Sequence, residues 1–206
     1  MKKLIIIIAL LFAGNCFAGE LQLKPFATYQ ISDSSELEFG HGIGGEMDYV
    51  FNNGFLTYAS YEFTPVSYQE HAYSNLNLPS IGLGYKKEGK HWNWFAKAGY
   101  YFVHDSDMER YESITTSKTV QIKPKYRCNK PQYMEVSETR LNRTKISFSD
   151  GYGAEVGFGY KYPLEKWYIG LDVSGRWIRL GQEINDVSDD IDKFDAKGML
   201  TVGFNF

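Results

Sequence analysis

Hydrophobic and polar residues alternate with a period of two along most of this 206-residue chain. A period of two is typical of β-strands that have one apolar face and one polar face. Eight segments show it, most clearly toward the end of the chain: 21–31, 39–51, 54–64, 77–86, 92–102, 152–162, 167–177 and 194–206. Each is close to the roughly 9–11 residues that a tilted strand needs to cross the hydrocarbon layer of a membrane. The sequence therefore predicts an all-β fold with eight strands.

The connections between these segments differ in length in a regular way. Three are tight turns, at 52–54, 87–90 and 163–166, and Asn53-Gly54 is a strong hairpin signal. The other four are longer: 32–38, 65–76, 105–150 and 181–193. An antiparallel up-and-down barrel would place all short turns at one end and all long loops at the other. Within the long third loop, alternation over 115–123 and 135–148 predicts a hairpin that protrudes beyond the barrel.

Glycine positions indicate which face of the strands points inward. Of fifteen strand glycines, twelve lie on the polar face, and only Gly45, Gly175 and Gly198 lie on the apolar face. The narrow interior of an eight-stranded barrel needs missing side chains, whereas a solvated exterior does not. The polar face is thus expected inside, which favours a transmembrane β-barrel over a soluble, lipocalin-like barrel with an apolar interior. After residue 18 the sequence contains no run of 18 apolar residues, which excludes a membrane protein built from transmembrane helices.

Charged residues on the polar face are then expected in the lumen. Six acids and five bases fall there: Lys24, Glu46, Asp48, Glu62, Lys97, Glu155, Lys161, Asp172, Arg176, Asp195 and Lys197. Buried charges persist only when they are paired or hydrogen-bonded. The near balance predicts an internal salt-bridge network that fills the lumen, with an ion pathway as the alternative. Eight strands exclude a large pore.

Residues 1–18 are predicted to be a cleaved signal peptide. Lys2 and Lys3 precede an apolar stretch of about ten residues, and Cys16-Phe17-Ala18 fits a cleavage site. Residues 19–206 would then form one domain with 20 basic and 25 acidic residues, a balance that argues against nucleic-acid binding. Cys128 would be its only cysteine, so no disulfide can form within the chain.

In its strand pattern and its end, Gly203-Phe204-Asn205-Phe206, the chain resembles the small outer-membrane β-barrels of the OmpX and OmpA transmembrane-domain type. The signal, the size and the long third loop are also similar, more faintly, to accessory colonisation factor A proteins. The resemblance implies a place in the bacterial outer membrane with loops at the cell surface, contacts with membrane lipid and lipopolysaccharide, and assembly by the barrel-assembly machinery. Phe204 and Phe206 would be the signal that this machinery recognises. Aromatic residues near the tight turns are expected to form an interfacial girdle: Trp92, Trp94, Tyr160, Tyr162 and Trp167.

The third loop carries a basic cluster: Lys118, Lys123, Lys125, Arg127 and Lys130. Basic clusters attract anions by long-range steering, and the candidates are lipopolysaccharide phosphates, sulfated host glycans and an acidic protein. The alternative is a loop that is merely soluble. The fourth loop is acidic, but the spacing of its carboxylates matches no calcium loop. No metal or cofactor is therefore predicted.

Function in such a scaffold is expected on the loops. The sequence favours a non-enzymatic surface protein whose external loops bind host or neighbouring cell surfaces, in adhesion or colonisation. One alternative is a structural barrel without a specific ligand, and another is an enzyme that modifies lipid A. His104-Asp105-Ser106 would be the catalytic candidate, but adjacent strand residues point to opposite faces. No catalytic residues are predicted.

Overall fold

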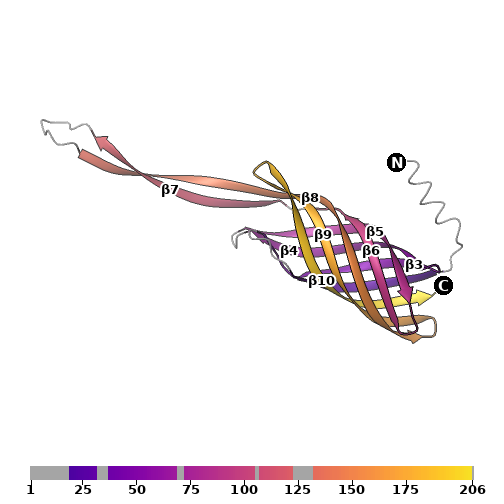
Figure 1. Ribbon diagram of the computed structural model, residues 1–206. Helices are drawn as coiled ribbons and strands as arrows, with labels where there is room; N and C mark the ends of the chain where they lie inside the picture. Colours follow the sequence, from indigo (N-terminus) through magenta and orange to yellow (C-terminus); the bar gives the residue numbers. More distant parts are fainter. Residues whose placement is uncertain (1–18, 32–36, 69–71, 105–106, 123–131, 206) are drawn as a thin grey trace, which may run out of the picture.

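The computed structural model describes residues 19–31, 37–68, 72–104, 107–122 and 132–205, which form one antiparallel sheet (Figure 1). Its strands are β1 (Gly19–Gln30), β2 (Leu37–Phe39), β3 (Gly42–Phe51), β4 (Phe55–Tyr68), β5 (Ala72–Glu88), β6 (Trp92–Tyr101), β7 (Met108–Ile122), β8 (Gln132–Leu164), β9 (Trp167–Ile184) and β10 (Val187–Asn205). In these ranges no helix has the length and apolar character needed to cross a membrane. The predicted signal peptide lies outside the described residues.

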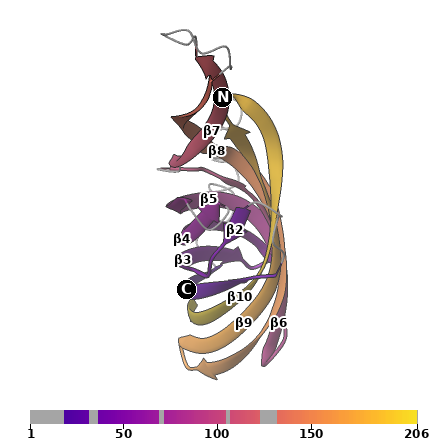
Figure 2. The ribbon, with the colours of Figure 1, turned by 90° about the vertical axis from the view of Figure 1, so that its left-hand side faces the viewer.

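Eight of the strands close into a barrel. In the order of hydrogen-bonded neighbours, β1 pairs with β3. The ring then continues through β4, β5, β6, β8, β9 and β10. It closes where β10 pairs back with β1, from Glu20 opposite Asn205 to Gln30 opposite Asp195. Closure gives each of the eight strands a hydrogen-bonded neighbour on both sides, as a strand in lipid requires. The predicted eight-stranded antiparallel up-and-down barrel is confirmed (Figure 2).

The two ends of the barrel differ. The turn end carries the short connections β3–β4, β5–β6 and β8–β9, and Gly54 takes a left-handed φ of 85° in the first of them. The hairpin end carries the β4–β5 and β9–β10 connections and β7. There β7 pairs with residues 132–146 of β8 to form a two-stranded extension, the β7–β8 ribbon. Figure 1 shows this ribbon projecting far from the barrel.

The predicted long loop over 181–193 is wrong. β9 runs to Ile184 and β10 starts at Val187, so only two residues connect them. Asn185 and Asp186 have φ values of 48° and 67°, the left-handed pair that a tight type I′ hairpin turn requires. Apart from Asp186 in the turn, the acidic residues of this segment lie on extended strands: Glu183 on β9 and Asp189, Asp190 and Asp192 on β10. A strand that has left the lipid needs no apolar exterior, so its polarity resembles that of a loop.

The connection predicted over 65–76 is also shorter than expected. β4 continues to Tyr68 and β5 begins at Ala72. Within the segment 32–38, Leu37 and Glu38 belong to the short strand β2, which pairs with the outer part of β4. At the hairpin end the strands thus extend well beyond the predicted transmembrane segments.

The polar face of the strands points inward, as predicted from the glycines. A Cβ atom on Gly99 would collide with the Tyr58 hydroxyl group and would lie 2.7 Å from the backbone oxygen of Ile81. Outward-facing Gly175 has nothing within 4 Å of the same position. The crowded face is therefore the lumen.

Candidate functional site

The structure places ten of the eleven predicted lumen residues in the buried interior of the barrel. The ten are Lys24, Glu46, Asp48, Glu62, Lys97, Glu155, Asp172, Arg176, Asp195 and Lys197. They come from seven of the eight barrel strands, because every second residue of a strand points inward. The eleventh, Lys161, lies at the turn end, where its ammonium pairs with Glu88. Its side chain is partly exposed there.

A middle network joins three lysines to four carboxylates: Lys24, Lys97, Lys197, Glu46, Asp48, Glu155 and Asp172. The Lys24 Nζ atom lies 2.8 Å from Asp48 Oδ2 and 3.3 Å from Asp172 Oδ2. The Lys197 Nζ atom lies 2.6 Å from a Glu46 oxygen and also reaches Glu155. Lys24 and Lys197 each bridge carboxylates on two different strands, and Lys97 of β6 pairs with two carboxylates of β3, so the network joins strands across the lumen.

A second network lies nearer the hairpin end. The Arg176 guanidinium donates two hydrogen bonds to Asp195, of 3.0 and 2.7 Å, and pairs with Glu62 at 2.5 Å. Lys193 contacts the same two carboxylates, at 2.9 Å for Glu62 and 3.0 Å for Asp195. The Thr64 hydroxyl donates a further 2.6 Å hydrogen bond to Glu62. Two cations and two carboxylates therefore neutralise each other in a fully buried cluster.

Three buried charged residues were not among those predicted for the lumen: Glu20, Lys86 and Lys193. Lys86 lies at the turn end, 2.8 Å from Glu88, and Tyr168 donates a hydrogen bond to Glu20 nearby. Glu20 lies one residue before the predicted strand 21–31. Lys86 is the last residue of the predicted strand 77–86, and its place two residues after inward-facing Gly84 could have identified it. Lys193 fell in a segment predicted as a loop, although it continues the inward series of Asp195 and Lys197.

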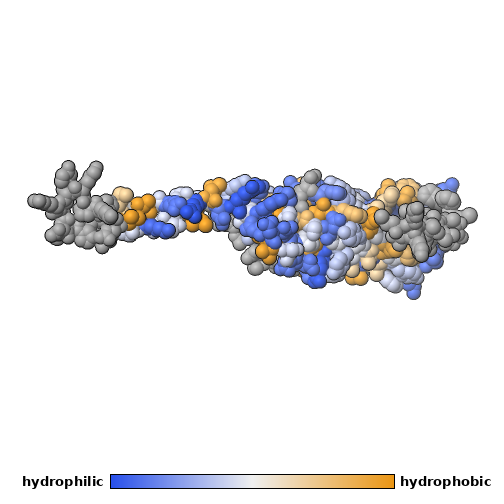
Figure 3. All heavy atoms as spheres, turned by 90° about the horizontal axis from the view of Figure 1, so that it is seen from above, coloured by the Kyte–Doolittle hydropathy of each residue, from blue (hydrophilic) through white to orange (hydrophobic). Residues whose placement is uncertain are grey.

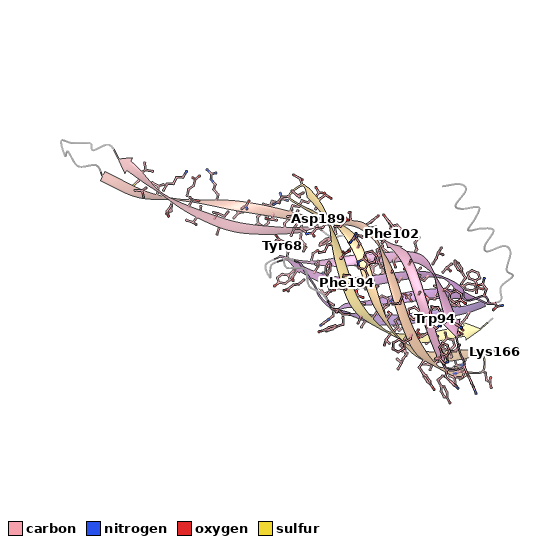
Figure 4. All side chains as sticks on the ribbon, in the orientation of Figure 1. Tyr68, Trp94, Phe102, Lys166, Asp189 and Phe194 are labelled. Carbon is pink, nitrogen blue, oxygen red and sulfur yellow. The ribbon has the colours of Figure 1, made fainter. Side chains whose placement is uncertain are left out.

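Above the charges, at the hairpin end, the interior becomes apolar. Its buried side chains form one cluster, the apolar plug: Phe39, Val66, Tyr68, Leu76, Leu78, Tyr101, Met108, Ile146, Phe148, Ile178, Leu180 and Ile191. Met108 and Ile146 belong to the first pair of the β7–β8 ribbon, so the plug also anchors the base of that ribbon. Tyr68 lies at this end in Figure 4, opposite Trp94 and Lys166 at the turn end. A packed plug above paired charges seals the lumen and favours the structural interpretation over an ion pathway.

The exterior changes polarity at the same level. Toward the turn end, outward residues are apolar and exposed, for example Val173, Leu200 and Phe158. Beyond Phe194 on β10, the next outward residue is Asp192, which accepts two 2.8 Å hydrogen bonds from Arg179. Figure 3 shows hydrophilic residues over the hairpin-end part of the barrel and hydrophobic residues toward the turn end. An apolar belt of this kind faces lipid, and its edge marks the membrane boundary.

Aromatic residues lie on the exterior near the turns. Those predicted for this girdle are exposed: Trp92, Trp94, Tyr160, Tyr162 and Trp167. Trp177, Phe194 and Tyr152 lie near the other edge of the apolar belt, where Tyr152 and Trp177 pack edge to face. Two girdles of aromatic residues with an apolar belt between them are typical of a transmembrane barrel.

Of the predicted basic cluster, Lys118 is exposed on β7, and Lys123, Lys125, Arg127 and Lys130 lie outside the described residues. The ribbon carries an ion pair of its own near its base. Tyr111 donates a 2.5 Å hydrogen bond to Glu109, and Arg143 pairs with the same carboxylate across the strands. The Tyr111 hydroxyl and the Arg143 guanidinium hold the pKa of Glu109 below its ordinary value.

The remaining predicted residues lie as follows. Phe204 points outward on β10 near the turn end, and Phe206 lies outside the described residues. His104 is exposed and forms an isolated bridge with Asn77, while residues 105 and 106 are not described. No group of three or more His, Cys, Asp or Glu side chains in the described ranges is arranged to hold a metal ion.

No protein-family model and no curated protein sequence matches the chain. Among solved structures, the N-terminal β-barrel domain of Pseudomonas aeruginosa OprF is 16% identical, with a TM-score of 0.42 over 91% of this chain and 99% of that one. Yersinia pestis Ail is 14% identical, with a TM-score of 0.35 over 92% and 99%. The fold is defined by the closed ring of strands and by the side chains that it turns inward and outward. That geometry is an eight-stranded antiparallel up-and-down β-barrel with an apolar belt on its exterior, the architecture of a transmembrane barrel.

Proposed function

We propose that this protein is a non-enzymatic surface protein whose β7–β8 ribbon binds a host or neighbouring cell surface. The observation that carries the proposal is the ribbon itself. Its strands pair from Met108 opposite Ile146 to Ile122 opposite Gln132. At about 3.4 Å per residue, the ribbon reaches roughly 45 Å beyond the barrel. No sealed barrel needs such an extension for its own stability.

In the proposed orientation, the turn end faces the periplasm and the hairpin end faces the medium. Outer-membrane barrels have short periplasmic turns and longer external connections. The polar exterior around Arg179 and Asp192 supports the same orientation, because strands that continue beyond the apolar belt must face water.

The ribbon is built to present a surface. An isolated pair of strands gains little stability from packing, so its exposed edges and faces are available to a partner. Its attachment is firm, since Met108 and Ile146 are buried in the apolar plug. The β9–β10 turn also holds the base, because the Lys145 amide donates a 3.0 Å hydrogen bond to the Asn185 side chain.

Excision of the ribbon tests the proposal. Residues 110–144 are replaced by Asn-Gly between Glu109 and Lys145, which lie opposite each other in the register. We expect adherence of cells that express the variant to fall to the level of cells without the protein. The retained Met108 and Ile146 keep the plug intact, and unchanged heat-modifiable gel mobility shows that the barrel still folds. Unchanged adherence with an intact barrel would contradict the proposal.

A structural barrel without a ligand is the second candidate, and the sealed lumen favours it. Paired charges and an apolar plug stabilise the barrel without any partner. In that case ribbon excision would leave adherence unchanged. Either role is non-enzymatic, so mass spectrometry should find the same lipid A in cells with and without the protein.

A further inference from the structure

We propose that the outer half of the ribbon docks onto an anionic phospholipid bilayer through one face, made by Lys118, Val120, Met134 and Val136. This inference rests on the proposed function, because it names the partner of the same ribbon. We call these four residues the distal face.

The register places the four residues side by side. Val120 lies directly opposite Met134, and Lys118 lies directly opposite Val136 on the next rung of the same face. Residues opposite each other in an antiparallel pair, and residues two apart on one strand, point to the same side. The exposed fractions of Val120, Met134 and Val136 are 48%, 52% and 40%. Three apolar side chains and one ammonium group thus form a contiguous exposed patch.

The other face of the ribbon has a different chemistry. Thr115 lies opposite Thr139 with hydroxyl oxygens 3.2 Å apart, and Ser117 lies opposite Ser137 at 3.4 Å. The outer half of the ribbon is therefore amphipathic, with hydroxyl groups on one side and apolar groups on the other. Such a segment binds at an interface between water and an apolar phase.

Charge is strongly segregated toward this part of the molecule. Residues 116–137 contain five cations, Lys118, Lys123, Lys125, Arg127 and Lys130, against the single acid Glu135. This segment carries a charge of +4 and the whole chain −3, which leaves −7 for all other residues. A positive pole on an acidic protein steers this part of the chain toward anionic surfaces.

An anionic lipid surface fits both properties at once, whereas a sulfated glycan fits only one. A polyanionic glycan is bound by cations alone and gives the three apolar side chains no partner. In a bilayer, the apolar side chains enter the boundary between headgroups and acyl chains while the Lys118 ammonium group contacts a phosphate. Because the distal face lies tens of ångströms from the barrel, that bilayer belongs to another cell or vesicle.

Vesicle sedimentation tests the inference. The protein in zwitterionic nanodiscs is mixed with phosphatidylcholine vesicles that do or do not contain phosphatidylserine. We expect binding only to vesicles with the anionic lipid, weakened by salt. Lys118→Gln should lower the affinity about fivefold, which corresponds to about 1 kcal/mol per cation at such a surface. The triple variant Val120→Thr, Met134→Thr, Val136→Thr should lower it at least about tenfold.

The matched control replaces exposed apolar residues of the ribbon outside the distal face. Ile114→Thr with Leu141→Thr should leave vesicle binding unchanged, since both residues lie nearer the barrel. All variants keep β-forming residues, and the barrel is checked by gel mobility.

Three results would overturn the inference: equal binding to both kinds of vesicle, equal losses in the control and the triple variant, or binding to heparin with none to vesicles. The last result, combined with lost adherence on ribbon excision, would leave the proposed function standing with a glycan as partner. Specific vesicle binding with unchanged adherence would instead support the inference and contradict the proposed function.

Discussion

Arg176 illustrates how single residues hold the lumen together. Its guanidinium contacts both Glu62 and Asp195 and is fully buried, so all three charges depend on one another. Burial of charge costs more than it returns unless every partner is present. The residue is therefore indispensable to its neighbours even though the network as a whole contributes little net stability.

We expect Arg176→Met to lower the free energy of unfolding by about 3–5 kcal/mol, because it leaves two carboxylates facing Lys193 alone. The matched control is Arg179→Met, which breaks a comparable pair with Asp192 on the exterior and should cost about 1 kcal/mol or less. Urea titration of the folded band on unboiled gels measures both. Equal losses would show that the lumen cluster has no special role.

Glycine substitution tests the assignment of faces. Gly99→Ala places a methyl group 2.7 Å from the Ile81 carbonyl oxygen, which the backbone cannot avoid, so we expect a loss of about 1–3 kcal/mol. Gly175→Ala adds the same group to open space on the exterior and should be neutral or slightly stabilising. The reverse order of stability in thermal unfolding would mean that the faces are exchanged.

Most of the inward-facing residues could be predicted from the sequence, because the period of two survives wherever a strand crosses the membrane. Lys193 was missed for a physical reason. It lies where the exterior becomes polar, so alternation of hydrophobicity no longer separates inside from outside. Lys193 is identified by its position two residues before inward-facing Asp195. A predicted strand extended beyond the membrane would have included it.

Among the elements, β10 contains the change of environment within one strand. Its outward residues run from Ser188 at the hairpin end, through Asp192 and Phe194, to Leu200 in the apolar belt. We expect Leu200→Arg to cost about 2–4 kcal/mol, as a charge in the hydrocarbon layer does, and Ser188→Arg to cost almost nothing. Folding yield into bilayers of defined composition measures the difference. Equal tolerance of both charges would contradict a membrane boundary between these positions.

The β7–β8 ribbon carries a pH-dependent contact at Glu109. Its pKa is lower in the folded ribbon than in an unfolded chain, so the stabilisation is present above the ordinary glutamate pKa and is lost as the pH falls through the lowered value. NMR titration of the Glu109 carboxyl should therefore give a pKa below the ordinary glutamate value. Tyr111→Phe should raise it toward that value, while Thr115→Val, on the same face but farther along the ribbon, should leave it unchanged. A Glu109 pKa that Tyr111→Phe leaves unchanged would show that the contact does not form in solution.

The lengths of the elements were harder to predict than their number. Lipid imposes the apolar face on a strand, so the sequence marks where strands cross the membrane but not where they end. In the part of β9 and β10 that lies beyond the membrane, Asn185 and Asp186 were the turn signal. The rest of the segment 181–193 resembles an acidic loop. For the same reason the sequence predicted a protruding hairpin over part of its length, and the structure extends it to the barrel rim.

Across the whole molecule, both inside and outside reverse their polarity at one level. Below it the lumen is charged and the exterior is apolar; above it the interior is the apolar plug and the exterior carries charges such as Arg179 and Asp192. The plug could not be predicted from the period alone, because a fixed rule of apolar outside and polar inside holds only in lipid. Water on the outside restores the arrangement of a soluble protein.

Spin labels on outward positions of β9 and β10 test this reversal most directly, in a Cys128→Ser background and a phospholipid bilayer. Labels at Val173 and Leu200 should be accessible to dissolved oxygen and protected from a water-soluble nickel complex, and labels at Asp190 and Asp192 should show the opposite. The change should fall between Phe194 and Asp192. Labels at Val173 and Leu200 that meet the nickel complex as readily as those at Asp190 would contradict a lipid-facing barrel.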